Sequence, residues 1–278
     1  MTTLFSWTGI DTHGPASIYI ASDSRISWGG NATWDVGRKI FSSRNHPEIF
    51  GYCGAVAFPI QVLGQLTNLI DDGLLFDDSD TIKIKIEKIK STIKNSLMAM
   101  PSCQRGTCEI LYATRISNRM NSSFHAAIIK IRTDGIYSEE FVLPEKSGLI
   151  ASSGSGSTSL KKWHDIWVGN PSQDPFLSGR TSRNVFSAFC DSLASKQDTF
   201  SGGAPQLVGI YREGAAKNFG VIYNNKRYLN GLEVPPSCEL NSIEWRNELF
   251  ERCCGNSMNV LGKAQRQPRL KGLLDPYS

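Results

Sequence analysis

The sequence predicts an α+β protein in which antiparallel sheets pack together and helices cover their outer sides. Two observations support this fold class. Strand-like runs occur in blocks separated by pairs of helix-like segments, instead of alternating singly with helices. The 278 residues are 40% hydrophobic and 20% charged, without a repeat or an interdomain linker, so the chain is long enough to bury one large core.

The strand-like runs are short and apolar or alternating, and most are separated by turn residues such as glycine, proline or aspartate. The first run begins at a threonine, directly after the initiator methionine. We expect strands at residues 2–8, 17–22, 35–41, 49–55, 108–114, 124–132, 136–142, 149–152, 205–212 and 218–223.

Four segments have the character of helices. The first, 59–70, is closed by Gly73, and the second begins after Ser79 or Asp80, either of which would cap it. At the start of the second segment, residues 82–86 alternate like a strand, but the longer stripe of isoleucines up to Met100 favours a helix. The other two helices are expected at 158–168 and 182–195.

The C-terminal region differs in composition from the rest. From about Gly231 the chain is rich in Pro, Asn, Ser and Arg, with one candidate helix at 242–253 and an extended arm from Gly255. We therefore expect a domain at 1–228 and a C-terminal extension at 229–278.

Composition and motif spacing argue against several function classes. The net charge is only +4 and the basic residues are spread out, which disfavours nucleic acid as a partner. The chain has neither an apolar stretch long enough to cross a membrane nor an N-terminal secretory signal. Its seven cysteines and four histidines lack metal-binding spacing, and the glycine-rich run 154–157 lacks the ending of a phosphate loop. We expect a cytoplasmic protein with reduced thiols and without metal or cofactor.

Thr2 follows Met1 directly, so removal of one residue would leave a threonine with a free α-amine. A threonine hydroxyl is a weak nucleophile until a base takes its proton, and an N-terminal amine is a known base for it. The pKa of an α-amine is about 7.7–8.0 in peptides, so a modest downward shift makes much of it neutral. Many proteins begin Met-Thr, and the pattern gains meaning only from the residues that follow.

Six short features occur in order between Thr2 and about Tyr228. They are Thr2 itself, Asp23-Ser24-Arg25, Lys39, Gly54, Ser155-Gly156, and the loop Asp198-Thr199-Phe200-Ser201-Gly202-Gly203. Each is weak alone, but together they resemble the proteasome β-subunit family of N-terminal-nucleophile hydrolases. The last loop favours the proteasome branch or its bacterial single-gene relatives.

The resemblance implies a four-layer α/β/β/α sandwich of two antiparallel sheets, with the active site at one end between them. It also implies a threonine peptidase that acts on peptides or unfolded proteins and assembles into a ring or another homo-oligomer. Most β-subunits release a propeptide by self-cleavage, whereas here removal of Met1 would suffice. The chain departs from the family in a longer turn between Thr2 and Asp23, in an early Pro59 in the first helix, and in the tail after Tyr228.

By this resemblance Thr2 is the nucleophile, and its α-amine acts as base and then as acid. Lys39 would favour a neutral amine and a more acidic hydroxyl, and Asp23 would anchor Lys39. Gly54 would offer its N–H to the developing oxyanion. The alternative for Asp23 and Lys39 is a structural ion pair, and for Gly54 an ordinary turn.

Ser155, Asp198 and Ser201 would form a hydrogen-bonded cluster around the amine of Thr2, although each of them alone is also explained as a loop cap. Arg25 is expected to be a structural partner near the site. The residues expected to bind substrate are uncharged and mostly apolar, which favours cleavage after apolar side chains: Ile26, Ser27, Gly37, Phe41, Tyr52 and Val56. Tyr52 at the base of the S1 pocket would favour small ones.

Two other functions stay open at this point. A proteasome-like subunit that only assembles or binds partners would be expected to have lost the threonine or the lysine, and this chain keeps both. An N-terminal-nucleophile amidohydrolase that acts on a small amide would use the same groups, and the shape of its cavity would distinguish it. The sequence says nothing of an unfoldase partner.

Overall fold

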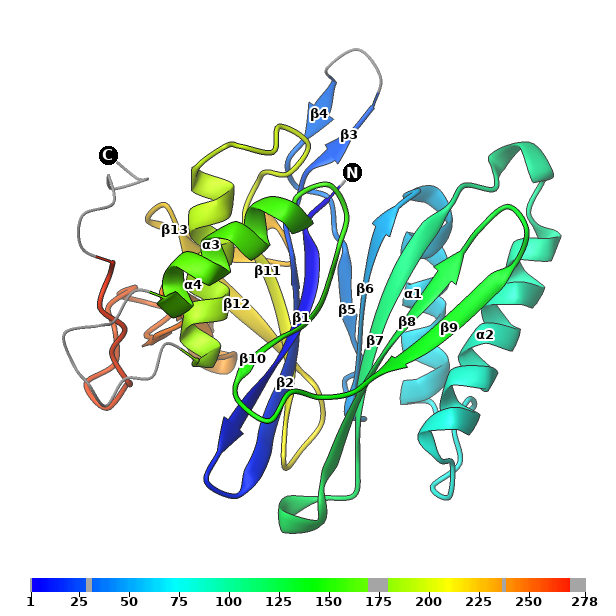
Figure 1. The fold of residues 1–278 in the computed structure, drawn as a ribbon, viewed down its shortest axis with the longest axis horizontal. Helices are drawn as coiled ribbons and strands as arrows, with labels where there is room; N and C mark the ends of the chain where they lie inside the picture. The colour runs from blue at the N-terminus through cyan, green and yellow to red at the C-terminus, as the bar shows by residue number, and fades with distance from the viewer. Residues whose placement is uncertain (1, 29–31, 170–179, 237–238, 271–278) are drawn as a thin grey trace.

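The computed structural model describes residues 2–28, 32–169, 180–236 and 239–270, which form four layers. Figure 1 shows them in order: helices α3 and α4, a large sheet, a smaller sheet, and helices α1 and α2. Apart from one short parallel pair in the C-terminal region, the described strands pair in antiparallel fashion. The structure therefore confirms the α/β/β/α sandwich of two antiparallel sheets.

The large sheet combines strands from both ends of the chain. Its order is β10-β1-β2-β11-β12-β13-β14, and β15 and β16 extend it from β12. β1 and β2 are buried along most of their length because other layers cover both of their faces. The strands are β1 (Leu4–Asp11), β2 (Gly14–Ser22), β10 (Gly148–Ser153), β11 (Gln206–Tyr211), β12 (Lys217–Tyr223), β13 (Lys226–Leu229), β14 (Leu232–Glu233), β15 (Trp245–Asn247) and β16 (Arg252–Cys253).

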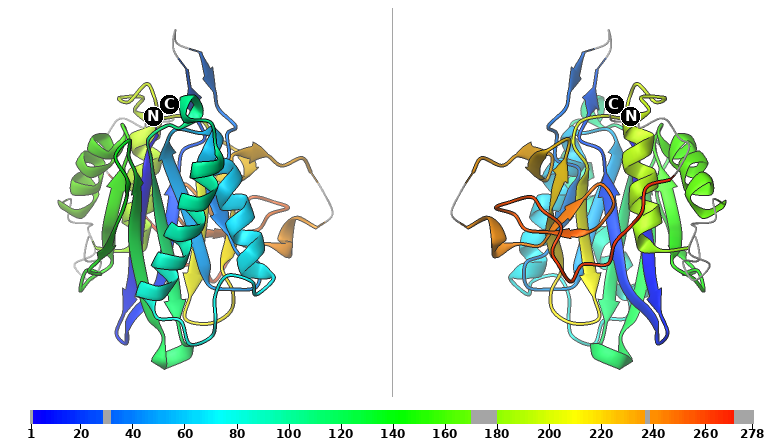
Figure 2. Two further views of the ribbon diagram at one scale, coloured as in Figure 1. Left: turned by 90° about the vertical axis from the view of Figure 1, so that its right-hand side faces the viewer. Right: turned by 90° about the vertical axis from the view of Figure 1, so that its left-hand side faces the viewer.

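The smaller sheet has the order β5-β6-β7-β8-β9, so its neighbours in space are neighbours in sequence. Its strands are β5 (Ile40–Ser42), β6 (Glu48–Gly54), β7 (Cys108–Ile116), β8 (Ser123–Ile131) and β9 (Ile136–Phe141). A separate hairpin of β3 (Ile26–Ser27) and β4 (Thr33–Trp34) projects from one end of the sandwich in Figure 1. Figure 2 shows this hairpin standing clear of the body from two further sides.

Each helix pair presents an apolar stripe to the outer face of one sheet. Helices α1 (Ala57–Asp71) and α2 (Ile82–Ala99) cover the smaller sheet, and the isoleucine stripe of α2 is buried there. Helices α3 (Ser157–Gly169) and α4 (Ser182–Ala194) cover the large sheet. Short 3-10 turns lie at Ser102–Gln104, Arg119–Asn121 and Leu240–Ser242. Among the described helices, none combines the length and the apolar character needed to span a bilayer.

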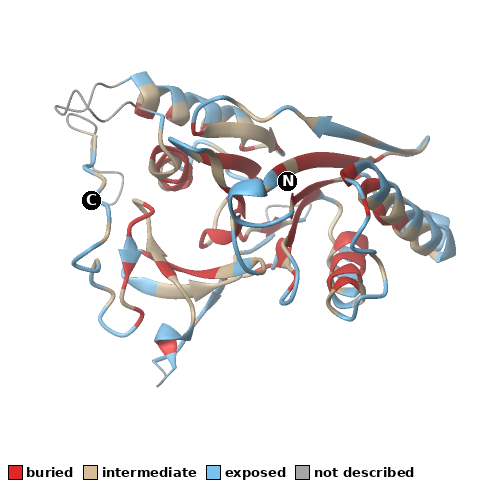
Figure 3. Cartoon of the chain, turned by 90° about the horizontal axis from the view of Figure 1, so that it is seen from below, coloured by how far each residue is buried: buried red, intermediate tan, exposed pale blue. Residues whose placement is uncertain are grey.

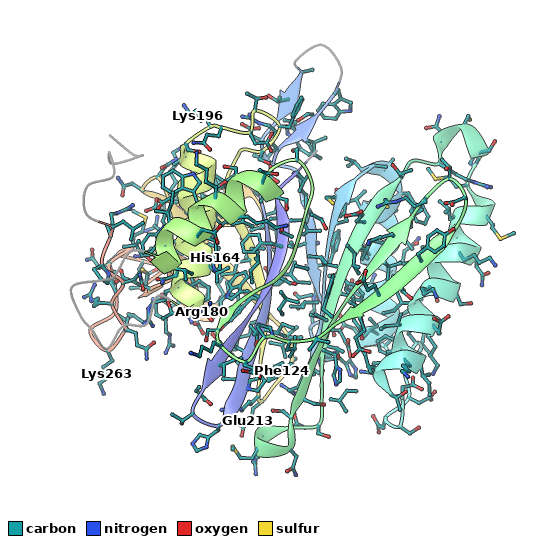
Figure 4. The ribbon with its side chains drawn as sticks, viewed as in Figure 1. Phe124, His164, Arg180, Lys196, Glu213 and Lys263 are labelled. Carbon is teal, nitrogen blue, oxygen red and sulfur yellow. The ribbon has the colours of Figure 1, made fainter. Side chains whose placement is uncertain are left out.

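The inner faces of the two sheets meet in a core that is mostly aliphatic. Leu4, Ile20 and Ile49 belong to it, and each is fully buried. Phe124 also belongs to it and is labelled in Figure 4, toward the lower end between the sheets. Figure 3 shows the arrangement from below, with buried residues along the sheets and exposed ones on the outer sides of the helices.

Most elements expected from the sequence are confirmed, with small shifts at their ends, but of the strand expected at 35–41 only residues 40 and 41 lie in a strand, β5. Gly73 ends α1 as predicted, because it has φ +68° and its N–H bonds back to the Ile70 carbonyl. The prediction that Ser79 or Asp80 caps α2 is wrong. Thr81 occupies the N-cap position without a side-chain hydrogen bond, and Asp80 instead forms an ion pair with Lys88 at 2.7 Å.

The helix expected at 242–253 is also wrong, because this stretch forms β15 and β16. Trp245 of β15 lies opposite Gly220 of β12, its ring is buried there, and any side chain at Gly220 would collide with it. Burial of this large ring against the sheet outweighs a weak helical pattern. Farther along, the arm reaches α4, where Gln267 donates to Asn184 at 2.7 Å.

Glu48 at the start of β6 is 1% exposed. Its carboxylate accepts hydrogen bonds from Lys85 of α2 at 2.5 Å and from Tyr112 of β7 at 2.6 Å. Burial raises the pKa of Glu48, and the Lys85 ammonium opposes this shift. The pair ties α2 to the smaller sheet at the end opposite Gly54.

Replacing Lys85 with Met should destabilise the protein more strongly as the pH rises. The pKa of Glu48 is higher in the folded protein than the ordinary value of 4.5, and removing Lys85 raises it further. The folded state then holds more protons than the unfolded state, so stability falls as the pH increases above that value. We expect a loss of about 3–5 kcal/mol at neutral pH and a much smaller one near pH 4.5, measured by urea unfolding.

The matched control is Lys83→Met, which removes an exposed lysine from the same helix and should change stability little at any pH. A pH-independent loss in Lys85→Met would contradict the prediction. It would show that Lys85 acts through packing, for example on the Phe76 ring, whose centroid lies 4.8 Å from its ammonium.

Candidate active site

The predicted catalytic residues converge at one end of the sandwich, beside the β3–β4 hairpin. Leu4 of β1 lies opposite Ser22 of β2 and Ser153 of β10, and Gln206 of β11 also pairs with Ser22. The start of the chain, the end of β2 and the loops next to β10 and β11 are therefore brought together. In Figure 1 this is the upper end, where the N-terminus is marked, and Lys196 in Figure 4 lies at the same end.

Asp23 directly follows β2 and is fully buried. Its Oδ1 accepts the Thr3 N–H and the Lys39 ammonium, each at 2.9 Å. Its Oδ2 accepts the N–H groups of Arg25 at 3.1 Å and Gly202 at 2.9 Å. Four donors thus satisfy a carboxylate whose charge would otherwise be costly to bury.

Lys39 lies immediately before β5 rather than on a strand, and only 1% of it is exposed. Burial lowers the pKa of the Lys39 amine, and the neighbouring Asp23 carboxylate opposes that shift. A lysine in this setting releases its proton more readily than one at the surface. The structure therefore brings the predicted Asp23–Lys39 pair together. The pair contacts the start of the chain at Thr3, the residue that follows Thr2.

A second polar cluster lies on the other side of the first residues. The Thr3 and Ser201 hydroxyls are 2.8 Å apart. Ser201 and Ser155 both donate to the same carboxylate oxygen of Asp198, at 2.7 and 2.8 Å. The three residues predicted to surround the amine of Thr2 are thus joined by hydrogen bonds to Asp198. Ser201 also contacts Thr3, just before β1.

The turn after β10 must contain glycine because it packs directly on the N-terminal backbone. Gly154 has φ +87°, and a side chain there would strike the Thr2 carbonyl. A side chain at Gly156 would strike the Thr3 hydroxyl, and the Gly156 N–H donates to the Thr2 carbonyl at 3.3 Å. Thr2 itself is 3% exposed in the chain that still carries Met1.

Arg25 clamps the loop that carries Asp198 to the base of the hairpin. Its guanidinium donates to both carboxylate oxygens of Asp35, at 2.7 and 2.8 Å, and to the Thr199 carbonyl at 2.9 Å. The structural role expected for Arg25 stays a prediction.

Gly54 ends β6 at the same end of the sandwich and is exposed. It has φ +99°, and an added Cβ would lie 2.6 Å from the Thr107 carbonyl oxygen. Only glycine therefore fits this position. That its N–H serves an oxyanion stays a prediction.

The residues expected to bind substrate occupy two places. Phe41 and Tyr52 are buried in the core beneath α1, and Val56 packs against the same core. A side chain at Gly37 would strike Ile26, so these two lie in contact beside the hairpin, and Ser27 follows on β3. These positions do not test whether the six residues bind substrate.

Sequence reasoning missed two residues at this site. Thr3 links the Asp23 pair to the serine cluster through its N–H and hydroxyl, yet its only signal is its place beside Thr2. Gln206 is a fully buried amide that bonds the segments of Asp23 and Lys39. A single glutamine within the apolar run 205–212 was the available signal.

Among the described residues, no group of three His, Cys, Asp or Glu side chains is placed to hold a metal ion. The described cysteines are free thiols: Cys53, Cys103, Cys108, Cys190, Cys253 and Cys254.

The order of the four layers is that of the α/β/β/α sandwich, the fold expected from the resemblance to N-terminal-nucleophile hydrolases. No family model matches the sequence, and no curated protein matches it. Among solved structures, the chain is similar to eukaryotic HslV from Trypanosoma brucei, with 13% identity and a TM-score of 0.45 over 75% of this chain and 99% of that one. The fold class rests on the layers and strand order of this chain.

Replacing Lys39 with Ala should destabilise the protein by about 3 kcal/mol, toward the lower end of the range for breaking a buried ion pair. The loss stays at that end because three backbone N–H groups still satisfy the Asp23 carboxylate. Urea unfolding at neutral pH measures it.

The control is Lys130→Ala. The Lys130–Glu139 pair spans 3.6 Å and is largely exposed, so its loss should cost less than about 1 kcal/mol. Equal stability losses in the two variants would show that the buried Asp23–Lys39 pair contributes no more to stability than the Lys130–Glu139 pair does.

Proposed function

We propose that this protein is an N-terminal threonine peptidase that hydrolyses peptide bonds with Thr2 as its nucleophile. The observation that carries the proposal is the Asp23 carboxylate, which accepts the Thr3 N–H and the Lys39 ammonium on one oxygen. A lysine is thereby held beside the backbone of the first residues. The fold supports the broader class, and the peptidase assignment within it is the proposal.

The base in this mechanism is the α-amine of Thr2, so the bond between Met1 and Thr2 must first be cleaved. As an amide, that nitrogen has no free lone pair to accept a proton. Once free, the amine would be oriented by Ser155 and Ser201, which Asp198 fixes through two hydrogen bonds. It would take the proton of the hydroxyl and later give it to the leaving amine.

The hydroxyl oxygen of Thr2 would attack the substrate carbonyl and form an acyl-enzyme ester, which water then hydrolyses. The Lys39 ammonium would stabilise the developing alkoxide and favour a neutral α-amine. The N–H of Gly54 would stabilise the oxyanion, because glycine lets the substrate approach the backbone closely.

The hairpin offers an edge for an extended peptide. Trp28 N–H donates to the Ala32 carbonyl at 2.9 Å, so the polar backbone groups of Ser27 point away from β4, toward the free edge of β3. A substrate strand added there would lie beside Ile26 and Gly37. The apolar S1 residues favour cleavage after small apolar side chains.

The proposal includes self-assembly into a ring or another homo-oligomer, with peptides or unfolded proteins as substrates and a cytoplasmic location. An unfoldase partner is not part of it. An enzyme that reacts with a threonine-directed epoxyketone yet hydrolyses only small amides would instead favour the amidohydrolase alternative.

Replacing Thr2 with Ala should abolish peptide hydrolysis and the reaction with an epoxyketone, while fold and assembly stay intact. Thr2→Ser should retain activity because it keeps a hydroxyl beside the amine. Turnover of fluorogenic peptides and intact mass after inhibitor treatment measure the two effects. The mechanism is wrong if Thr2→Ala keeps activity within about tenfold of wild type, a barrier change of only about 1.4 kcal/mol.

Thr8→Ala is the matched control for this experiment. Thr8 is a buried threonine on β1, the strand that follows Thr2, and its hydroxyl donates to the Ser17 carbonyl at 3.0 Å, away from the catalytic groups. Its removal should cost about 1 kcal/mol of stability and leave turnover per molecule unchanged.

Protein that retains Met1 should be inactive, because its Thr2 nitrogen is an amide and cannot act as a base. Blocking the methionine aminopeptidase during expression provides this form, and intact mass verifies it. Its turnover is compared with that of protein that begins at Thr2. Equal turnover of the two forms would show that the α-amine is not the base.

A further inference from the structure

Gln206 begins β11, and its side chain is fully buried behind the Asp23–Lys39 pair. The two N–H groups of the amide nitrogen Nε2 are shared among three acceptors: the Asp23 carbonyl at 3.1 Å, the Ser24 hydroxyl at 3.0 Å and the Gly37 carbonyl at 2.8 Å. The amide oxygen Oε1 accepts the Lys39 N–H at 3.0 Å. One side chain thus bonds the backbones of both residues in the ion pair.

The orientation of this amide follows from its partners. Two of the groups around Nε2 are carbonyl oxygens, which can only accept a hydrogen bond, and the group at Oε1 is an N–H, which can only donate. A flipped amide would face oxygen with oxygen at Asp23 and Gly37, and N–H with N–H at Lys39. Gln206 is therefore held in one orientation.

We propose that Gln206 is a positioning residue that sets the register between Asp23 and Lys39 and so aims the lysine ammonium at Thr2. The inference rests on the proposed function of Thr2 and Lys39. Gln206 touches neither substrate nor the reacting atoms, and it acts through the two backbones that it joins.

Other contacts hold the same two segments together, but apart from the Asp23–Lys39 ion pair none of those described reaches Lys39. The Gly37 N–H donates to the Ser24 carbonyl at 2.9 Å, and Arg25 pairs with Asp35. These contacts bring the segments side by side, whereas Gln206 bonds the backbone N–H of the lysine. A displacement of about 1 Å at a catalytic group can cost about 100-fold in rate. The hydrogen bond from the Lys39 N–H to Gln206 is therefore expected to affect the reaction rate.

The surroundings of Gln206 leave little room for a replacement contact. Gly231, in the turn between β13 and β14, has φ +84°, and a Cβ added there would lie 3.3 Å from Nε2. The same Cβ would lie 2.3 Å from the Ser24 hydroxyl oxygen were the backbone unchanged, so the turn packs tightly on this pair. The C-terminal extension therefore covers the amide from outside.

The first test is Gln206→Met, which keeps the length of the side chain and removes all four hydrogen bonds. We expect kcat for a fluorogenic peptide to fall at least tenfold while KM changes by a smaller factor, because Gly37 is the one expected substrate-binding residue that the amide is described to contact. Reaction with an epoxyketone should slow by a similar factor. If Gln206→Met does not fold, Gln206→Glu is the second variant. It keeps the oxygen that faces the Lys39 N–H and places a second oxygen against the Asp23 and Gly37 carbonyls. The same fall in kcat is expected.

The matched control is Gln267→Met in the outer layer. Gln267 also joins separate segments, since it donates to Asn184 at 2.7 Å and accepts from Arg183 at 3.1 Å. Its loss should lower the unfolding temperature without changing kcat. A purely structural role of Gln206 would give the same pattern in both variants.

A titration of Lys39 separates this inference from the proposed function, because it needs no activity. Lysine labelled with ¹³C at the ε position is followed by NMR across pH, and the Lys39 signal is assigned with Lys39→Arg. Loosening the pair with Asp23 should lower the Lys39 pKa by at least half a unit in Gln206→Met and leave it unchanged in Gln267→Met. An unchanged Lys39 titration in folded Gln206→Met overturns the inference whatever the kcat. Inactive wild-type protein would refute the peptidase and leave this titration to decide the role of Gln206.

Discussion

The carboxylate of Asp23 is the group on which the rest of this site depends. It carries a charge into a fully buried position, and such a charge is tolerated only when donors surround it. Its four donors come from the start of β1, from Lys39, from the residue after Ser24 and from the loop before β11. Because each donor must reach one of two oxygens, four separate parts of the chain are held in a single arrangement.

The position of this group follows from the layers. The middle of the sandwich is an aliphatic core, in which the backbone groups of β1 and β2 are used by their ladders. Backbone N–H groups become available where these ladders end, and three of them donate to Asp23 there. The Asp198 carboxylate lies at the same end and accepts two serine hydroxyls. At the opposite end of the smaller sheet, Glu48 accepts side-chain donors from Lys85 and Tyr112.

The C-terminal extension is part of this arrangement rather than an independent tail. Trp245 seats β15 on β12, and the turn at Gly231 packs on Ser24 and Gln206 behind the ion pair. The amide of Gln206 is thus covered by a residue of the C-terminal extension, which follows all six sequence features in the chain. A substitution at Gly231 is therefore expected to disturb the site through Ser24 and Gln206.

The sequence by itself determined most of the helices and strands, because apolar spacing and turn residues such as Gly73 act on near neighbours. It also determined which residues to examine at the site, since Asp23, Lys39 and the Asp198 loop stand in a recognisable order. Only the tertiary structure decided the rest. The partners of Gln206 lie 167 to 183 positions away in the chain, so no local pattern reports them. Trp245 likewise lies in a strand and not a helix because its ring packs on Gly220, where there is no side chain. This contact exists only after the sheet has formed.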